Sequence, residues 1–364
     1  MGAGRLRRRI HCALVSFVPG WGRPAVAPSA GVPDGLDPSL LDQLCCQYLG
    51  GHVTGVRYVH LSSWKSAGSY RLLVEAGQRR WSLIYKNAVY HPEDIPALID
   101  LPVTPGAPEF MVYCSVRGPL AAYLPAVYCC AELVCGRHYQ YLMEDLGDAY
   151  RKVHNDEGIL NAVEELPAIQ RAIGEWAGTV RQERLLRYDE GFSAALEGFV
   201  WRHIEPYAVV SRPGLAYEVW RSRTAISELH RRREFREMTQ TGAIHGDYNP
   251  SNVLYHVQRP EQIKLLDWEW AGVGVPHADL VSLMKGARPD VEERALRIFA
   301  DHDRGLGLAE HRRLYDWCKL ERGLLDGAFM AAQFLRLPPT TGFNFSGHIE
   351  ASMRRVLIAL QQLA

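Results

Sequence analysis

The chain has 364 residues, 47% of them hydrophobic and 23% charged, and its 41 Lys and Arg balance its 41 Asp and Glu. This length favours two domains or lobes, and the composition is typical of a globular protein with a large core. A net charge of zero gives no sign of the basic surface of a nucleic-acid binder, so we expect no nucleic-acid partner. The uncharged stretch 118–131 is too short to span a bilayer, so we expect no membrane partner.

Residues 1–37 are rich in Gly, Pro and Ala, and an arginine cluster precedes a short apolar run at residues 10–18. His11 and Ser16 interrupt this run and no convincing cleavage site follows it, so the segment differs from a signal peptide. We expect residues 1–37 to form a disordered extension. A short helix over residues 38–49 should follow, with Asp37 as its N-cap.

The eight cysteines form no C-x-x-C unit and no secreted disulfide pattern, which favours reduced thiols in a cytoplasmic protein. Cys129, Cys130, Cys135 and His138 lie close together in the sequence. Their spacing is not that of a metal site, and we interpret these cysteines as structural.

Alternating apolar and polar residues predict three antiparallel strands at 55–61, 70–75 and 81–85, with a turn over residues 62–69. Two further strands are expected at 126–133 and 139–143. Beyond residue 149 the pattern becomes helical: apolar residues recur every three or four positions from Leu166 to Val180. Further helices are predicted at 216–238, 281–285, 291–302, 310–335 and 348–363. The chain is therefore predicted to be an α+β protein with a small β-rich N-terminal part and a larger helical part.

Residues 243–280 contain the main candidate catalytic and metal-binding residues. Two apolar runs, 253–257 and 263–266, are separated by a turn and predict a β-hairpin. Asp247 precedes this hairpin and Asp267 follows it, so the hairpin brings both carboxylates to the same side. Asn252 stands five residues after Asp247, at the start of the first strand.

These residue types suit phosphoryl transfer from a nucleotide to a hydroxyl. Such a reaction needs an acceptor for the hydroxyl proton and Mg²⁺ to neutralise phosphate charge. Asp247 fits the first task. Mg²⁺ prefers oxygen ligands and keeps several waters, so Asn252 and Asp267 are the candidate metal ligands.

His245, Asp247 and Asn252 follow the H-x-D-x-x-x-x-N pattern of protein kinases, and Asp267 takes the place of their metal-binding Asp. The segments DYNPSN and DWEWAG resemble the corresponding motifs of the aminoglycoside phosphotransferase and choline kinase-like small-molecule kinases. The resemblance implies a two-lobed protein-kinase-like fold, a nucleotide-binding lobe at residues 38–145 and a catalytic and substrate-binding lobe at 146–364. It also implies that His245 and Asp279 support the catalytic loop.

The same resemblance implies the nucleotide site. Lys86, in the wording IYK, matches the family's phosphate-binding lysine, and Glu109 is its candidate partner, with Glu93 as the alternative. Backbone groups near Glu144 and Leu146 would pair with the nucleotide base. Small residues of the predicted turn, represented by Ser66 and Gly68, would approach its phosphates. The phosphoryl donor is ATP or GTP, since nothing in the sequence distinguishes adenine from guanine.

The acceptor is a small molecule with a hydroxyl group, and the family offers aminoglycosides, other antibiotics, choline, ethanolamine and sugars. Residues 151–240 carry 14 Lys and Arg against 14 Asp and Glu, which favours a sugar- or nucleoside-like antibiotic over a heavily cationic one. Phosphorylation would then confer resistance by inactivation. Glu269, Trp268 and Trp270 are candidate substrate contacts, although core packing is the favoured role for at least one of the two tryptophans. The alternatives are a metabolic choline, ethanolamine or sugar kinase, and a nucleotide-binding pseudokinase scaffold.

Overall fold

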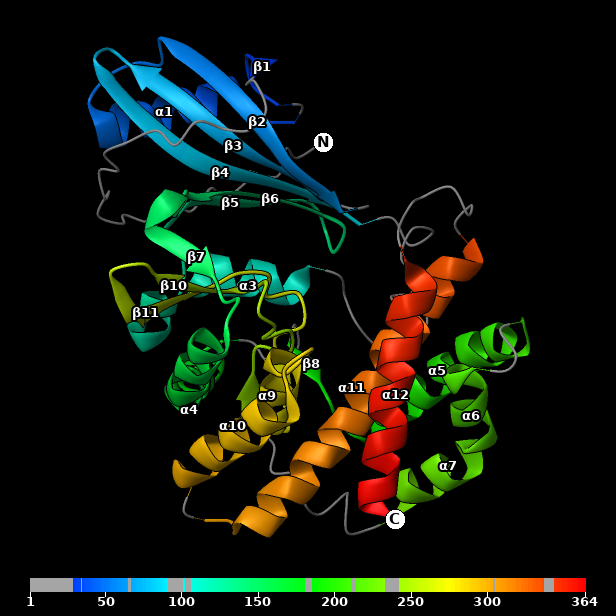
Figure 1. The fold of residues 1–364 in the computed structure, drawn as a ribbon. Coiled ribbons are helices and arrows are strands. Elements are labelled where there is room, and N and C mark those ends of the chain that lie inside the picture. The colour runs from blue at the N-terminus through cyan, green and yellow to red at the C-terminus, as the bar shows by residue number, and fades with distance from the viewer. Residues whose placement is uncertain are drawn as a thin grey trace.

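The computed structural model describes residues 29–33, 35–64, 67–90, 101, 106–180, 185–210, 214–232, 242–303, 305–336 and 344–364. Figure 1 shows an N-terminal lobe built on a β-sheet and a larger lobe of helices below it. The predicted α+β, kinase-like architecture is confirmed.

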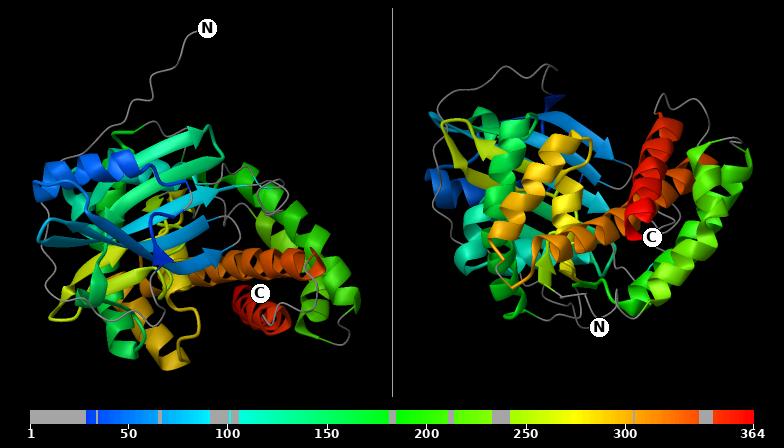
Figure 2. Two further views of the ribbon diagram at one scale, coloured as in Figure 1. Left: turned by 90° about the horizontal axis from the view of Figure 1, so that it is seen from above. Right: turned by 60° about the horizontal axis from the view of Figure 1, so that its bottom comes forward.

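The N-terminal lobe is a six-stranded sheet in the order β1-β2-β3-β4-β6-β5, and each pair of neighbours is antiparallel. Its strands are β1 (Ser29–Ala30), β2 (Gly55–Trp64), β3 (Ala67–Ala76), β4 (Arg79–Val89), β5 (Val127–Val134) and β6 (His138–Glu144). Helix α1 (Pro38–Leu49) lies against one face of the sheet, where Leu41 and Leu44 pack with Leu72 and Trp81 (Figure 2). Its predicted cap is confirmed, since the Asp37 carboxylate accepts a hydrogen bond from Ser39 N at 2.9 Å.

Two expectations about this lobe are wrong. Strands β2 and β3 pair as far as Trp64 and Ala67, so most of the predicted turn 62–69 belongs to the hairpin strands. Gly68 lies in β3, opposite Asn87 of β4, whereas Ser66 lies outside the described residues. Of the expected disordered extension, residues 1–28 also lie outside the description. Within residues 29–33 and 35–37, β1 pairs with β2 and Leu36 is buried in the lobe's core, so this part is ordered.

The expectation of reduced cysteines is wrong for one pair. A disulfide with an S–S distance of 2.07 Å joins Cys114, in helix α3 (Ala107–Ser115), to Cys130 of β5. Cys45, Cys46, Cys129, Cys135 and Cys318 are free thiols. The sequence did not predict this disulfide, because Cys114 is 15 residues away from the cysteine cluster. The two meet only through the packing of α3 on β5.

The C-terminal lobe is mainly helical. Two short 3₁₀ helices, Gly118–Tyr123 and Gly147–Ala149, accompany the transition between lobes. The helices are α4 (Asp156–Ala177), α5 (Glu190–Val210), α6 (Leu215–Arg221), α7 (Arg223–Arg231), α9 (His277–Leu283), α10 (Pro289–Asp301), α11 (Leu308–Arg336) and α12 (Phe345–Leu363). The predicted helix 216–238 is divided at Ser222 into α6 and α7, and its end lies outside the described residues. Helix α5 was not predicted.

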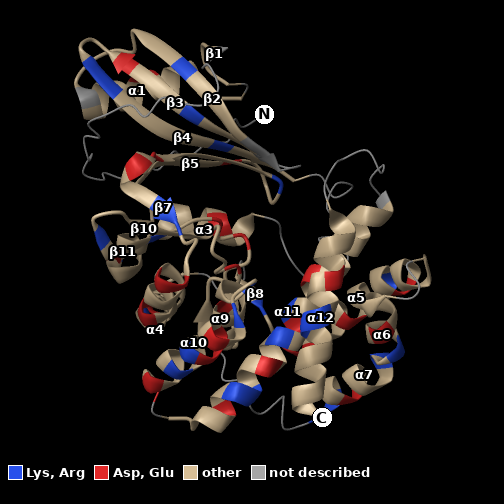
Figure 3. Ribbon diagram, viewed as in Figure 1, with Lys and Arg blue, Asp and Glu red and all other residues tan. Residues whose placement is uncertain are grey.

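Helices α11 and α12 run side by side and separate α5–α7 from α4, α9 and α10 (Figures 1 and 2). Positive and negative residues are interspersed along α11 (Figure 3). None of the helices in the described part of the chain combines the length and apolarity that crossing a bilayer requires.

Two small sheets position the loops that lie between the two lobes. One contains β7 (Tyr150–Lys152), β10 (Val253–His256) and β11 (Arg259–Leu265), so the predicted hairpin over residues 253–266 is confirmed. The other contains β8 (Leu186–Arg187), β9 (Gly242–Ile244) and β12 (Gly272–Gly274). In this second sheet β12 lies between its partners, parallel to β8 and antiparallel to β9.

Gly272 allows this close pairing, because a Cβ added there would lie 2.3 Å from the carbonyl oxygen of Leu186. We expect Gly272→Ala to lower the free energy of unfolding by about 1–3 kcal/mol, since backbone atoms cannot yield as a flexible side chain would. Chemical denaturation measures this change. The control is Gly198→Ala in α5, where an added Cβ meets nothing within 4 Å and a neutral or stabilising effect is expected. Equal effects of the two substitutions would contradict the argument.

Candidate active site

The segment between β9 and β10, residues 245–252, forms a loop that approaches other backbone closely. Gly246 has φ +77°, and a Cβ there would lie 1.9 Å from the carbonyl oxygen of Trp270. Only glycine fits both constraints. The loop therefore carries Asp247 past the segment that follows the hairpin.

Asp279, at the start of α9, anchors this loop. Its carboxylate accepts hydrogen bonds from the backbone N–H of His245 at 3.0 Å and of Gly246 at 2.8 Å. Gln170 of α4 adds a third bond at 3.2 Å. Burial raises the pKa of Asp279 to about 6, and these three bonds oppose the rise. The expected contact between Asp279 and the loop is thus present.

His245 is fully buried beneath the loop. Burial lowers its pKa to about 4, so the ring is neutral at pH 7. Its Nε2 lies 3.1 Å from the carbonyl oxygen of Leu266 and donates to it, while Nδ1 accepts from the backbone N–H of Asp247 at 3.3 Å. The neutral ring therefore joins the Asp247 loop to the end of the hairpin.

The Asp247 carboxylate is held from two sides. Asn252 donates from Nδ2 to Oδ2 at 2.9 Å and to the Asp247 carbonyl oxygen at 3.0 Å. Arg322 of α11 donates from Nη2 to Oδ1 at 2.6 Å. Burial raises the pKa of Asp247, and the Arg322 guanidinium opposes that rise.

Across the lobes, Lys86 of β4 meets three carboxylates. Its Nζ lies 2.9 and 2.8 Å from the two oxygens of Glu109, 3.2 Å from Asp267 and 3.6 Å from Glu269. Burial opposes the charge of the Lys86 ammonium, but these carboxylates raise its pKa well above the ordinary value. The predicted pair of Lys86 with Glu109 is present, and Glu109 is fully buried in α3. The alternative partner, Glu93, lies outside the described residues.

The oxygens near Asp267 fit a hard divalent cation. Asp267 has φ +63°, the one non-glycine positive φ found in the described residues, and its side chain is 45% exposed. The Asn252 amide turns its nitrogen toward Asp247, so its oxygen is left with only a long bond from Ser251 at 3.4 Å. A backbone bond from Leu266 N to Asn252 O, 3.0 Å long, keeps the two candidate ligands near each other. Carboxylate and amide oxygens are the donors that Mg²⁺ takes.

Three predicted substrate contacts need correction or remain predictions. Trp268 is fully buried, with its ring centre 4.3 Å from that of His245, so it cannot contact a substrate. Glu269 accepts a hydrogen bond from Tyr90 and faces Lys86, so it lies on the Lys86 side of the site rather than in an acceptor cavity. Trp270 is half-buried against the main core and stays a prediction.

The residues expected to contact a nucleotide base, Glu144 and Leu146, lie where β6 ends and the chain enters the second lobe. The Glu144 carboxylate accepts a bond from Ala126 N at 3.0 Å. Between them, Asp145 forms an ion pair with Arg71 at 2.7 Å and accepts a bond from Ser82. The segment that connects the two lobes is therefore held in place by contacts with the sheet.

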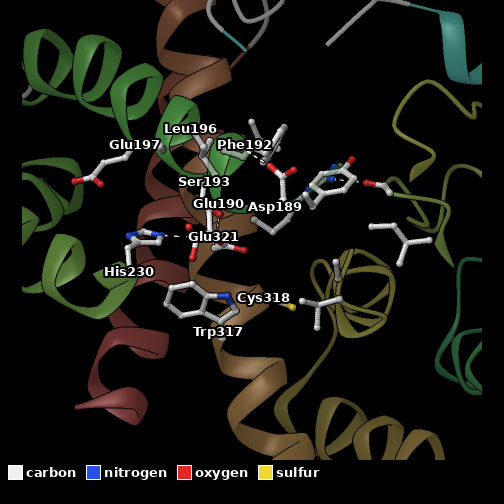
Figure 4. A pocket seen from close by; sticks show the side chains of 18 of the residues that line it. Asp189, Glu190, Phe192, Ser193, Leu196, Glu197, His230, Trp317, Cys318 and Glu321 are labelled. Atoms are coloured by element: carbon white, nitrogen blue, oxygen red, sulfur yellow. Dashed lines mark hydrogen bonds and ion pairs between the residues drawn. The ribbon is translucent and has the colours of Figure 1, made fainter. Parts of the chain in front are cut away.

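Beside the loop of residues 245–252 lies a cavity of about 420 Å³. Gly246 and Arg322 line the end nearest Asp247, and α5, α7 and α11 supply most of the remainder. Four carboxylates and two arginines are among its lining residues: Asp189, Glu190, Glu197, Glu321, Arg231 and Arg322. Figure 4 shows His230 and Glu321 facing each other beside the ring of Trp317.

Glu321 is held by contacts with two neighbouring helices. It lies 3.7 Å from His230 Nε2 and accepts a bond from Ser193 Oγ at 3.2 Å. Burial raises the pKa of Glu321 to about 7. Burial also lowers the pKa of His230. The cavity therefore holds acidic groups whose charge a bound cation would stabilise.

Sequence reasoning missed Arg322 and Glu321. Both lie on α11 in the wording CKLERG, which matches no short catalytic motif. Their apolar neighbours predicted the helix correctly, yet nothing local to it indicates that Arg322 meets a carboxylate 75 residues earlier. The contact depends on how α11 packs against the loop of residues 245–252.

Comparison with solved structures finds the same fold with low identity. Choline kinase LicA from Streptococcus pneumoniae is 13% identical with a TM-score of 0.53, covering 89% of this chain and 98% of that one. Spectinomycin phosphotransferase in complex with ADP and spectinomycin is 12% identical with a TM-score of 0.53, covering 90% and 98%. Choline kinase from Cryptosporidium parvum is 10% identical with a TM-score of 0.56, covering 90% and 96%.

A search of curated proteins finds no significant match to this chain. The profile of the phosphotransferase enzyme family matches residues 120–317, which is more than half of the chain and includes Asp247, Asn252, Asp267 and Asp279. The chain therefore belongs to the phosphotransferase enzyme family.

Proposed function

We propose that this phosphotransferase moves the γ-phosphoryl group of ATP to a hydroxyl of a small molecule that carries a positively charged nitrogen. The observation that carries the proposal is the position of Asp247 between Lys86 and an acidic cavity. On one side Lys86 provides a buried cation for phosphates. On the other, the acidic cavity reaches Gly246 and Arg322, which are adjacent to Asp247 in the chain and in space, respectively.

Each group in the site has a role in this reaction. Lys86, oriented by Glu109, would bind the nucleotide phosphates, and Asn252 and Asp267 would hold Mg²⁺, which would neutralise charge on the phosphates. Asp247 accepts the proton of the acceptor hydroxyl and orients its oxygen toward the γ-phosphorus. His245 and Asp279 hold the loop in this arrangement. The presence of Asp247, Asn252 and Asp267 favours catalysis over a pseudokinase scaffold.

The cavity changes the expectation about the acceptor. Over residues 151–240 the charges balance, but the cavity gathers four carboxylates against two arginines, one of which is paired with Asp247 and Asp326. Local clustering of negative charge favours a positively charged ligand over an uncharged sugar. Spectinomycin and choline, named for two structures of similar fold, are both hydroxyl compounds with a basic or quaternary nitrogen.

An aminoglycoside-type antibiotic, inactivated by phosphorylation, is therefore our first candidate acceptor, and a choline- or ethanolamine-type metabolite is the second. A cavity of about 420 Å³ is large enough for the former. The reaction draws on the ATP of the cytoplasm, where we place the protein.

Asp247→Asn is the first test of this function. We expect phosphotransfer to fall by at least about 1,000-fold while ATP binding changes little, because Asn keeps the shape of the side chain but cannot accept a proton. Intact-mass detection of phosphorylated product should be run on a panel of spectinomycin, hygromycin B, choline, ethanolamine and simple sugars, with Mg²⁺ and either ATP or GTP. Undiminished transfer in Asp247→Asn would refute the assignment, and no product from the wild type across a wider acceptor panel would favour the scaffold alternative.

Lys86→Met tests the nucleotide side. We expect kcat/KM for ATP to fall about 100-fold, because a charge-assisted contact with phosphate is lost. Steady-state kinetics at saturating acceptor measure this. Lys152→Met in β7, an exposed lysine outside the site, is the matched control and should behave as wild type. A similar loss in both variants would argue against a specific role of Lys86.

Glu321→Gln tests the acceptor side. We expect the KM of the amine-bearing acceptor to rise about 10-fold with the KM of ATP unchanged, because a charged contact contributes roughly 1.5–3 kcal/mol. Since the pKa of Glu321 is near 7, the wild-type acceptor KM should also fall as pH rises from 6 to 8 and the carboxylate ionises. Glu310→Gln, at the exposed start of the same helix, is the control. An unchanged acceptor KM in Glu321→Gln would place the amino group elsewhere.

A further inference from the structure

We infer that Arg322 is the positioning residue that fixes the Asp247 carboxylate for catalysis, an inference that rests on the proposed function. Nothing in the motif that contains Asp247 provides such a cation, and Arg322 comes from helix α11, 75 positions later in the chain.

The guanidinium is held through all three of its nitrogens. Nη2 donates to Asp247 Oδ1 at 2.6 Å, Nη1 donates to the carbonyl oxygen of Gly246 at 2.6 Å, and Nε donates to Asp326 Oδ1 at 3.1 Å. A planar guanidinium with three separate acceptors has little rotational freedom. It therefore fixes both the side chain of Asp247 and the peptide group that precedes it.

Asp326 in turn holds Arg322 in place. Its Oδ2 accepts bonds from Lys285 at 3.1 Å and from Arg355 of α12 at 2.8 Å, so three cations surround one carboxylate. Burial would raise the pKa of Asp326, but these cations together lower it below its ordinary value and keep the group charged. Arg322 and Asp326 also stand four positions apart on α11, the spacing at which side chains of one helix meet.

The two oxygens of Asp247 are thus held by donors from different elements. Asn252, from the catalytic loop itself, binds Oδ2, whereas Arg322 binds Oδ1. These two contacts fix the plane of the carboxylate, and each oxygen keeps a lone pair for the acceptor hydroxyl. Because small displacements of a reacting group reduce rates strongly, loss of one contact should reduce kcat rather than nucleotide affinity.

Arg322 also lines the acidic cavity, with its side chain 17% exposed. An acceptor that enters through the cavity therefore meets Asp247 and Arg322 together. Lysine would not replace this residue, because a single ammonium cannot span Asp247, Gly246 and Asp326 with a fixed geometry.

The test compares Arg322→Gln, Arg322→Lys and Arg322→Ala with wild type, using ATP, Mg²⁺ and an acceptor that the wild type phosphorylates. We expect kcat to fall about 100-fold in Arg322→Gln and to remain at least about 10-fold low in Arg322→Lys, with the Kd of ATP within about 2-fold. Added guanidinium chloride at millimolar concentration should restore activity at least about 10-fold in Arg322→Ala, and should not do so in Asp247→Ala. Arg312→Gln, which removes an α11 arginine paired with Glu293, should keep wild-type kcat.

Several outcomes would overturn the inference. One is a kcat within about 3-fold of wild type in folded Arg322→Lys or Arg322→Gln, and another is an equal loss in Arg312→Gln. A rise in the Kd of ATP as large as the fall in kcat would assign Arg322 to the nucleotide instead. Failure of guanidinium to restore Arg322→Ala, with the thermal unfolding midpoint lowered, would show a structural ion pair only. Absence of any transfer by wild type would refute the proposed function itself, and this inference with it.

Discussion

The contact between Asp279 and the backbone of His245 and Gly246 fixes the centre of this protein. A carboxylate buried in the helical lobe accepts two N–H groups from a loop whose glycine has a positive φ. The loop lies so near the Trp270 carbonyl that a single added carbon would collide with it. The direction in which Asp247 leaves the loop is thus set by backbone hydrogen bonds and steric exclusion, which tolerate little change in the residues involved.

Local chemistry explains why the centre of the site could be predicted from the sequence. Asp247, Asn252 and Asp267 lie within 21 residues and flank a hairpin that the apolar runs predict, and the structure has that hairpin. The pairing of Lys86 with Glu109 followed from the family resemblance rather than from any local pattern, and the two residues do meet. The helices could be predicted because apolar residues recur every three or four positions over long stretches, and one exception does not hide that pattern.

Long-range packing explains what could not be predicted. Arg322 contacts Asp247 because α11 crosses the loop, and the Cys114–Cys130 bond forms because α3 packs on β5. Neither contact has a signature in the neighbouring residues. Trp268 shows a related limit: the sequence favoured core packing for at least one of Trp268 and Trp270 but could not say which. The chain turns at Asp267, and the Trp268 indole lies in the core.

Ion pairs between charged residues of the site link the two lobes. Lys86 belongs to the sheet of the first lobe, while Asp267 and Glu269 come from the second, so their ion pairs join the lobes, together with the bond from Tyr90 to Glu269. A cation bound by Asp267 would compete with Lys86 for the same carboxylate, and phosphates would in turn bind both cations. A bound nucleotide would thus replace one set of charge contacts between the lobes with another. On the other side of Asp247, carboxylates again outnumber arginines among the residues that line the cavity. Arg322, ion-paired with both Asp247 and Asp326, opposes the rise in the pKa of Asp247 that burial causes.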